Sequence, residues 1–353
     1  MSLLFAIFIF SVLIFVHELG HFITAKLCGV QVNEFSMFMG PAIWKKQVGE
    51  TLYAIRTIPM GGYCAMEGED EDTDNPRSFQ KAAWWKRLII LVAGSAMNLL
   101  TGLLIYACLF LPADEIIVPE IREFTDCCIF NTEDGLHLGD EILEIDGEKI
   151  YSNSDISLLL NLNSTGVHDL VIRRGDSILT FTDYPMTHMC PNQNGEDYVH
   201  YGFGFGVVHE SDFATNLSYV GKVVADDVRM VRLSLQMLLT GKAGLQDMAG
   251  PVGIVSQMSE IAAESGTAWN AFLNLLSVGA FLAINLAVMN LLPIPALDGG
   301  RAVCLLLTTA VEAVTRKKIN PKYEGYLHTV GFILLIGLMA VVMFKDVFVL
   351  IKG

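Results

Sequence analysis

Residues 13–24 read Leu-Ile-Phe-Val-His-Glu-Leu-Gly-His-Phe-Ile-Thr, and they place three ionisable side chains inside an otherwise apolar stretch. His17 and His21 are four positions apart, so on an α-helix they share one face, about one turn apart, and can bind the same metal ion. Glu18 lies beside them in the sequence. A carboxylate that does not bind the metal can accept a proton from a water molecule that the metal activates, so this pattern is typical of a hydrolytic zinc site.

This stretch belongs to an apolar segment, residues 3–25, which is about 23 residues long and therefore long enough to cross a bilayer. A helix with two incidental histidines is the alternative. Ionisable groups at membrane depth, however, cost on the order of 3 kcal/mol each and usually have a function. The segment has neither the basic start nor the small-residue cleavage site of a signal peptide, so we expect a mature membrane helix.

The whole chain has the composition of an integral membrane protein, because 52% of its 353 residues are hydrophobic and only 17% are charged. Three further spans are expected at residues 88–111, 269–292 and 328–348. Asn98 is a polar residue among small ones within the second span, and close packing of two helices is its simplest explanation.

Residues 31–66 alternate polar and apolar side chains and are interrupted by glycine and proline. This pattern predicts a β-hairpin or a small sheet that ends at Gly61-Gly62-Tyr63, with a plain connecting loop as the alternative.

The acidic residues are concentrated in one region, because residues 113–227 contain five Lys and Arg against 22 Asp and Glu. An acidic domain of this kind repels nucleic acid, so we expect no nucleic-acid partner. Within it, the stretch Gly135-Leu-His-Leu-Gly-Asp-Glu-Ile-Leu-Glu-Ile-Asp-Gly147 resembles the signature of a PDZ domain. Such domains capture extended peptides on a sheet edge, which makes Leu136, Gly139 and Asp140 the candidate peptide-binding loop. A small acidic spacer domain is the alternative.

The second half of the chain contains the residue that can complete the metal site. Residues 290–301 read Asn-Leu-Leu-Pro-Ile-Pro-Ala-Leu-Asp-Gly-Gly-Arg, and their two prolines interrupt regular helix. Broken backbone at membrane depth is tolerated only where it is buried in protein or lines a watery cavity. Asp298 alone could simply cap the next helix, but with two histidines it becomes the expected third ligand and leaves a fourth position for water.

Together these patterns predict a polytopic α-helical membrane protein with four transmembrane helices, a membrane-associated β-hairpin and an inserted PDZ-like α+β domain outside the cytoplasm. The expected parts are an N-terminal membrane part, a PDZ-like domain, an amphipathic linker on the membrane surface and a C-terminal membrane part, at residues 1–117, 118–210, 211–267 and 268–353.

Basic residues lie between the first two spans and between the last two, at Lys45, Lys46, Lys86 and Arg87, and at Arg316, Lys317, Lys318 and Lys322. The positive-inside bias therefore predicts that the metal lies near the cytosolic face of the cell membrane and that the acidic domain lies outside.

With both motifs in place, the chain resembles the site-2 protease family of intramembrane zinc metalloproteases, peptidase family M50, and in particular the bacterial regulators of sigma-factor signalling with one PDZ domain. The resemblance rests on His17-Glu-Leu-Gly-His21 and on Asn290 to Gly300, and it covers nearly the whole chain. It implies that Zn²⁺ is bound by His17, His21 and Asp298, and that Glu18 is the general base. Substrate contacts are implied for Asn290, Pro293, Pro295, Gly61 and Gly62.

The resemblance further implies regulated intramembrane proteolysis, in which the enzyme cuts in or near the transmembrane segment of a single-pass membrane protein already shortened by a site-1 protease. Anti-sigma factors and signal-peptide remnants are substrates of this kind. Because histidine and aspartate within spans also build ion pathways, a membrane metal transporter or a metal-dependent membrane scaffold is the alternative function.

Overall fold

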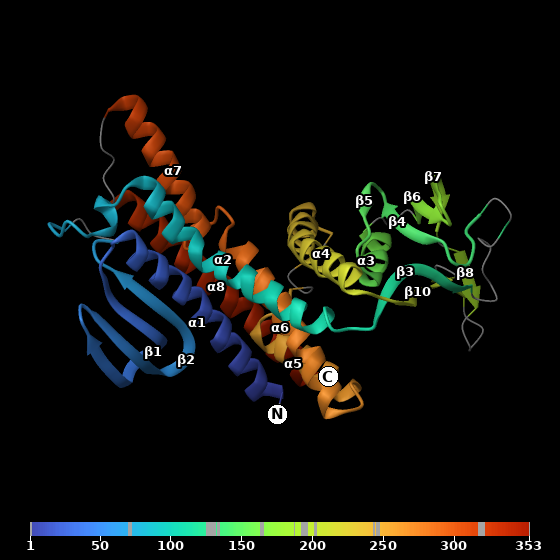
Figure 1. The fold of residues 1–353 in the computed structure, drawn as a ribbon, viewed down its shortest axis with the longest axis horizontal. Helices are drawn as coiled ribbons and strands as arrows, with labels where there is room; N and C mark the ends of the chain where they lie inside the picture. The colour runs from blue at the N-terminus through green and yellow to red at the C-terminus, as the bar shows by residue number, and fades with distance from the viewer. Residues whose placement is uncertain are drawn as a thin grey trace. The chain divides into compact units, whose positions relative to one another are not determined.

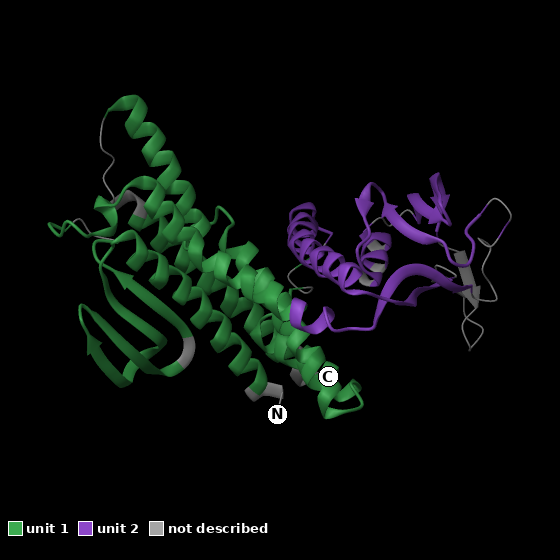
Figure 2. Ribbon diagram, in the orientation of Figure 1, with its two compact units in different colours: residues 1–106, 243–353 green, residues 107–242 purple. Residues whose placement is uncertain are grey.

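The computed structural model describes residues 2–69, 73–124, 132, 135–162, 166–186, 188–191, 197–200, 203–242, 244, 248–316 and 322–352. The chain folds into two compact units (Figure 2), the first formed by residues 1–106 and 243–353 and the second by residues 107–242. The second unit is therefore an insertion between two membrane-type parts of one fold.

Four helices are long and apolar enough to cross a membrane among the residues that the structure describes, with spans at Phe5–Cys28, Trp84–Phe110, Ala268–Asn290 and Gly325–Phe348. They belong to α1 (Ser2–Cys28), α2 (Trp84–Phe110), α6 (Ala268–Asn290) and α8 (Lys322–Lys352). The four predicted spans are thereby confirmed as helices. Two shorter helices, α5 (Pro251–Glu264) and α7 (Asp298–Thr315), complete the helical part of the first unit, and a 3₁₀ turn, η1 (Phe79–Lys81), precedes α2.

Both halves of helix α1 pack against other elements of the first unit (Figure 1). Toward its N-terminal half, Ala6, Ile9 and Leu13 are buried in a cluster with side chains of α5 and α6. Toward its C-terminal half, Ala25 is buried in a second cluster with residues of the two strands and of α2 and α7. The segment that contains the two histidines is thus fixed between these two clusters.

The predicted hairpin is confirmed as two long antiparallel strands, β1 (Val32–Val48) and β2 (Thr51–Met66). Both strands bend back on themselves, as the pairing shows: Ser36 is paired with Tyr63 on one side and with Ala54 on the other. Arg56 stabilises the bend by binding the Glu34 carboxylate, Ser36 Oγ and the carbonyl oxygen of Gly40. The segment 62–66 consequently forms an edge of this small sheet, paired through one side with residues 32–37.

The second unit contains a sheet with the strand order β10-β3-β4-β6-β7, in which the short strand β5 pairs with β4. The elements of the second unit are β3 (Glu115–Phe124), β4 (Glu141–Ile145), β5 (Glu148–Lys149), α3 (Asn153–Leu162), β6 (Val167–Arg174), β7 (Ser177–Pro185), β8 (His188–Pro191), β9 (Asp197–His200), β10 (Phe203–Glu210) and α4 (Phe213–Thr240). Helix α3 follows β5, and β6 and β7 form a hairpin that turns at Gly175.

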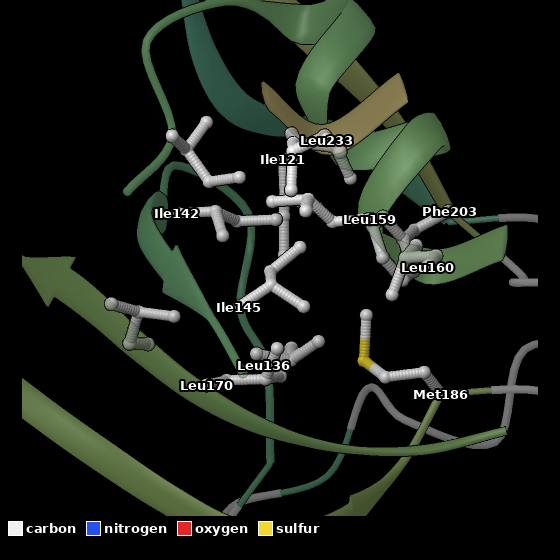
Figure 3. Packing of buried hydrophobic residues seen from close by; sticks show 13 residues of the cluster. Ile121, Leu136, Ile142, Ile145, Leu159, Leu160, Leu170, Met186, Phe203 and Leu233 are labelled. Atoms are coloured by element: carbon white, nitrogen blue, oxygen red, sulfur yellow. The ribbon is translucent and has the colours of Figure 1, made fainter. Parts of the chain in front are cut away.

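One apolar core holds the second unit together (Figure 3). Ile142, Ile145 and Leu170 enter it from the sheet, and Leu159 and Leu160 enter it from α3. Leu233 also belongs to this core, although it comes from α4. In β6 buried and more exposed residues alternate, which gives the sheet one face toward this core.

Helix α4 differs from the prediction of a separate linker at 211–267. It belongs to the second unit, whereas α5 belongs to the first. Arg229 of α4 is buried and binds Asp155 and Asp226 as well as the carbonyl oxygen of Lys149. Amphipathic periodicity identified the helix but could not show that its charged side is satisfied by buried carboxylates.

Candidate metal centre

Three side-chain atoms of the first unit meet at one point, as the sequence predicts. Nε2 of His17 and Nε2 of His21 are 3.3 Å apart, and Oδ2 of Asp298 lies 3.1 Å from the first and 3.3 Å from the second. Zinc–ligand bonds of 2.0–2.1 Å at tetrahedral angles place neighbouring ligand atoms about 3.3 Å apart. The three atoms therefore lie at the spacing that one face of a zinc tetrahedron requires.

The hydrogen bonding of His21 shows that a cation fits between these atoms. Nδ1 of His21 lies 2.8 Å from the carbonyl oxygen of Ile90, which can only accept, so Nδ1 carries the proton. In the neutral ring Nε2 then directs a lone pair toward Asp298 Oδ2, an atom that is buried without a hydrogen-bond donor. Converging lone pairs repel one another unless a positive ion lies between them, and two imidazoles with one carboxylate suit Zn²⁺.

Asp298 reaches this point because the chain breaks and restarts just before it. Helix α6 ends at Asn290, and α7 begins at Asp298 with Leu297 as its N-cap, which makes no side-chain capping bond. A Cβ on Gly299 would lie 2.2 Å from the carbonyl oxygen of Leu291, so only glycine lets α7 begin against the loop. Asp298 thus faces the histidines, and the alternative of a capping residue does not hold.

Helix α8 supports the same loop from its other side. Nδ1 of His328 accepts a hydrogen bond of 3.0 Å from the backbone N–H of Ala296, whose φ of 82° is unusual for a residue with a side chain. A Cβ on Gly331 would lie 2.5 Å from Cβ of Pro295, so α8 and the loop are in close contact. These contacts fix the turn that directs Asp298 inward.

Glu18 lines a cavity of about 760 Å³ together with the three candidate ligands. The other walls come from residues 63–69 at the end of β2, from Thr73 and Leu91, and from Ala296 and Arg301. The Glu18 carboxylate lies beside the backbone of Cys64, and Arg301 forms an ion pair with Glu69. A carboxylate, three metal ligands and space for water therefore occur in one place.

Of the residues predicted to contact substrate, Gly62 lies beside Glu18. A Cβ on Gly62 would lie 3.3 Å from Cγ of Glu18, and Gly61 has a φ of 76° that favours glycine. Asn290 is the last residue of α6, while Pro293 and Pro295 belong to the loop that follows. None of these three residues and neither glycine is among the residues that line the cavity. Their substrate contacts stay a prediction.

The predicted peptide-binding loop of the second unit makes internal contacts. Leu136 is buried in the core, and the backbone N–H of Gly139 donates to the carbonyl oxygen of Ile121. The Asp140 carboxylate is fully buried and accepts hydrogen bonds from Arg174 and from the backbone N–H of His137. Peptide binding by this loop stays a prediction that these contacts do not support.

Sequence reasoning missed the residues that support the ligands from other helices. Ile90 accepts from His21, and Gly94 and Asn98 lie beside the two imidazoles. His328 was likewise not identified. Only the polarity of Asn98 within an apolar span gave a signal, and helix packing explained it equally well.

Known proteins that are similar to this chain are assigned as zinc metalloproteases. The family model of peptidase family M50 matches residues 5–338. A Clostridium perfringens protein assigned as a zinc metalloprotease is 37% identical over 98% of both chains, and a Clostridium acetobutylicum protein with the same assignment is 33% identical over 98% of this chain and 97% of its own. The regulator of sigma-W protease RasP from Bacillus subtilis is 27% identical over 97% of both chains. The chain therefore belongs to peptidase family M50 and is a zinc metalloprotease with several membrane helices.

Proposed function

We propose that this zinc metalloprotease is of the site-2 type and hydrolyses a peptide bond in or near the transmembrane segment of a single-pass membrane protein that a first protease has shortened. The observation that carries the proposal is the joint position of His17, His21 and Asp298 beside Glu18 in one cavity of the apolar unit. Anti-sigma factors are the substrate class suggested by the relative from Bacillus subtilis, whose name is regulator of sigma-W protease.

In the proposed reaction, His17, His21 and Asp298 hold Zn²⁺, and Glu18 moves the proton. When bound, Zn²⁺ supplies Lewis-acid activation of water and of the scissile carbonyl group. Glu18 accepts the proton of the attacking water and delivers it to the leaving amine. Glu18 and Cys64 line the cavity together with the three candidate ligands.

The edge of the small sheet is the proposed binding site for the peptide. Residues 62–66 pair with β1 through one side, and residues 63–66 line the cavity. A transmembrane helix hides its carbonyl groups in hydrogen bonds, so it must unwind before hydrolysis. Addition of the unwound segment as a further strand at 62–66 would satisfy its backbone groups beside Glu18.

We further propose that the second unit is PDZ-like and excludes substrates that have not been cut once. Strand β10 ends the sheet, and we propose its outer edge as the place where an extended peptide adds. A deletion that tests the filter should remove residues 114–242 together, because loss of 118–210 alone would leave Arg229 of α4 without its partner Asp155. If an uncut substrate is then cleaved no faster than by the full chain, the filter is refuted.

The proposed orientation places the metal near the cytosolic face and the second unit outside the cell. Its support is the group of basic residues between α1 and α2. Cysteines introduced at Asp74 and Asp176, both exposed, test it in intact cells with a membrane-impermeant maleimide, with the parent chain as background. Labelling at position 176 and protection at position 74 are expected, and the reverse pattern would refute the orientation.

Replacement of Glu18 by glutamine tests the enzymatic mechanism. The Glu18→Gln variant should bind zinc like the parent chain but should fail to cleave a membrane substrate, because the amide cannot accept the proton. Glu260→Gln, at an exposed position of α5, is the matched control and should cleave normally. Cleavage retained by Glu18→Gln would refute the mechanism, and zinc flux into vesicles that Glu18→Gln abolishes would favour a transporter.

A further inference from the structure

One face of helix α2 lies against the two histidines of α1. Ile90, Gly94 and Asn98 are each four positions apart, so they lie on the same side of α2. The carbonyl oxygen of Ile90 accepts from Nδ1 of His21 at 2.8 Å. The Asn98 side chain lies beside the other ring, with Nδ2 3.4 Å from Nδ1 of His17. Each imidazole therefore meets a polar group of α2 at the nitrogen that faces away from Asp298.

Gly94 makes this arrangement possible because it provides space between the two polar groups. A Cβ at this position would lie 2.4 Å from Nε2 of His21 and 2.7 Å from Cε1 of His17. The absence of a side chain lets α2 approach both rings. The same close contact places Asn98, which is 1% exposed, directly against His17.

The hydrogen bonding of Asn98 is incomplete in a way that His17 can satisfy. Its Oδ1 is buried and has no hydrogen-bond partner. A half-turn of the amide group exchanges Oδ1 and Nδ2 and leaves the shape of the side chain unchanged. A histidine that binds a metal through Nε2 carries its proton on Nδ1 and needs an acceptor there. After the half-turn, Oδ1 accepts from Nδ1–H of His17, so the His17 ring gains the acceptor that it needs.

We propose that Asn98 is a positioning residue of the metal centre. Its amide oxygen accepts a hydrogen bond from Nδ1–H of His17 and thereby fixes the tautomer and the ring orientation that direct Nε2 toward Asp298. Ile90 performs the same task for His21 with its backbone carbonyl group. The inference rests on the proposed roles of His17 and His21 as ligands, and it replaces the simpler interpretation of Asn98 as a residue that only lets helices pack closely.

The affinity for zinc, measured on the full chain in detergent by competition with a chromophoric chelator, tests the proposal without any cleavage assay. Asn98→Leu keeps a similar volume but removes the acceptor, and Asn98→Ala removes the group altogether. Both should lower zinc affinity about 10- to 100-fold, which is the usual effect of losing such a supporting partner. Asn98→Asp keeps an acceptor in the same place, so its affinity should stay within a few-fold of the parent chain.

Ser95→Ala is the control, because Ser95 is buried in the same helix and its Oγ makes no hydrogen bond. It should bind zinc like the parent chain. The visible spectrum of the Co²⁺-loaded chain gives a second readout, which should change for Asn98→Ala and be kept by Asn98→Asp.

Two results would overturn the proposal: zinc binding by Asn98→Leu or Asn98→Ala that equals that of the parent chain, or an equal loss in Asn98→Ala and Asn98→Asp. The second result would indicate packing rather than hydrogen bonding. A parent chain that binds no zinc would instead refute the metal centre itself, so failure of this inference and failure of the proposed function are distinguishable.

Discussion

Replacement of Gly94 by alanine would place a methyl group between the two histidines of the metal centre. The added Cβ would lie 2.4 Å from Nε2 of His21 and 2.7 Å from Cε1 of His17. Because non-bonded carbon atoms normally keep about 3.5 Å, at least one ring must move by about 1 Å. Metal–ligand distances tolerate deviations of only about 0.2 Å, so the displaced imidazole can no longer bind in the same geometry.

The cost of such overpacking is about 1–3 kcal/mol. If all of it opposes metal binding, the zinc affinity of Gly94→Ala falls about 5- to 150-fold, since each 1.4 kcal/mol corresponds to a factor of ten. Competition with a chelator on the full chain in detergent measures this change, and a thermal melt of the zinc-free chain measures stability separately.

The matched control is Gly337→Ala in α8, where an added Cβ meets nothing within 4 Å. This variant should bind zinc like the parent chain. Equal zinc affinity of Gly94→Ala and Gly337→Ala would refute the conclusion that the space at Gly94 is required by the ligands.

Three further predictions concern the supporting contacts. His328→Leu removes the acceptor of the Ala296 N–H, so hydrogen exchange in residues 291–298 should become faster and zinc affinity should fall several-fold, whereas unchanged exchange would contradict the role of α8. Burial and the neighbouring Asp155 carboxylate raise the pKa of Asp226 from 3.8 to about 7, so the native second unit holds a proton that the unfolded chain releases. The stability of the second unit should therefore fall as the pH rises from about 4 to about 7 and then level off, and Asp226→Asn should reduce this slope. Hydrogen exchange of the α4 amides, corrected for the pH dependence of exchange itself, measures the slope. An equal slope in both chains would contradict the assignment. Arg174→Met leaves the Asp140 carboxylate buried without its partner and should destabilise the second unit by about 3–5 kcal/mol, whereas Arg173→Met, at a half-exposed arginine, should cost less than about 1 kcal/mol in the same denaturation experiment.

Those parts of the fold that depend on residues close together in the sequence were predictable from it. The four long apolar stretches correspond to α1, α2, α6 and α8, and the alternating pattern at 31–66 corresponds to β1 and β2. His17 and His21 share a face because the helix repeat of 3.6 residues requires it. The two prolines before Asp298 likewise predicted the break between α6 and α7, since proline disrupts a regular helix.

The domain boundaries were less predictable because they depend on contacts between distant segments. Helix α4 follows the sheet in the sequence and has the periodicity of an amphipathic surface helix. Leu233 nevertheless lies in the core of the second unit, and Arg229 binds Asp155 from α3. A charged residue on a predicted helix is expected in water, and only the arrangement of acidic partners around it determines that it is buried.

The sequence by itself determined that two candidate ligands share one face of a helix and that Glu18 is adjacent to them. It also determined that a carboxylate follows a segment in which the helix is interrupted. Only the tertiary structure brought Asp298 to within 3.3 Å of both imidazoles, and only it placed Ile90, Gly94 and Asn98 behind them. The physical reason is that helical periodicity fixes which residues of one helix are neighbours. The faces on which separate helices meet are decided by close packing, here by glycines that allow α2 to touch α1 and α7 to begin against its own loop.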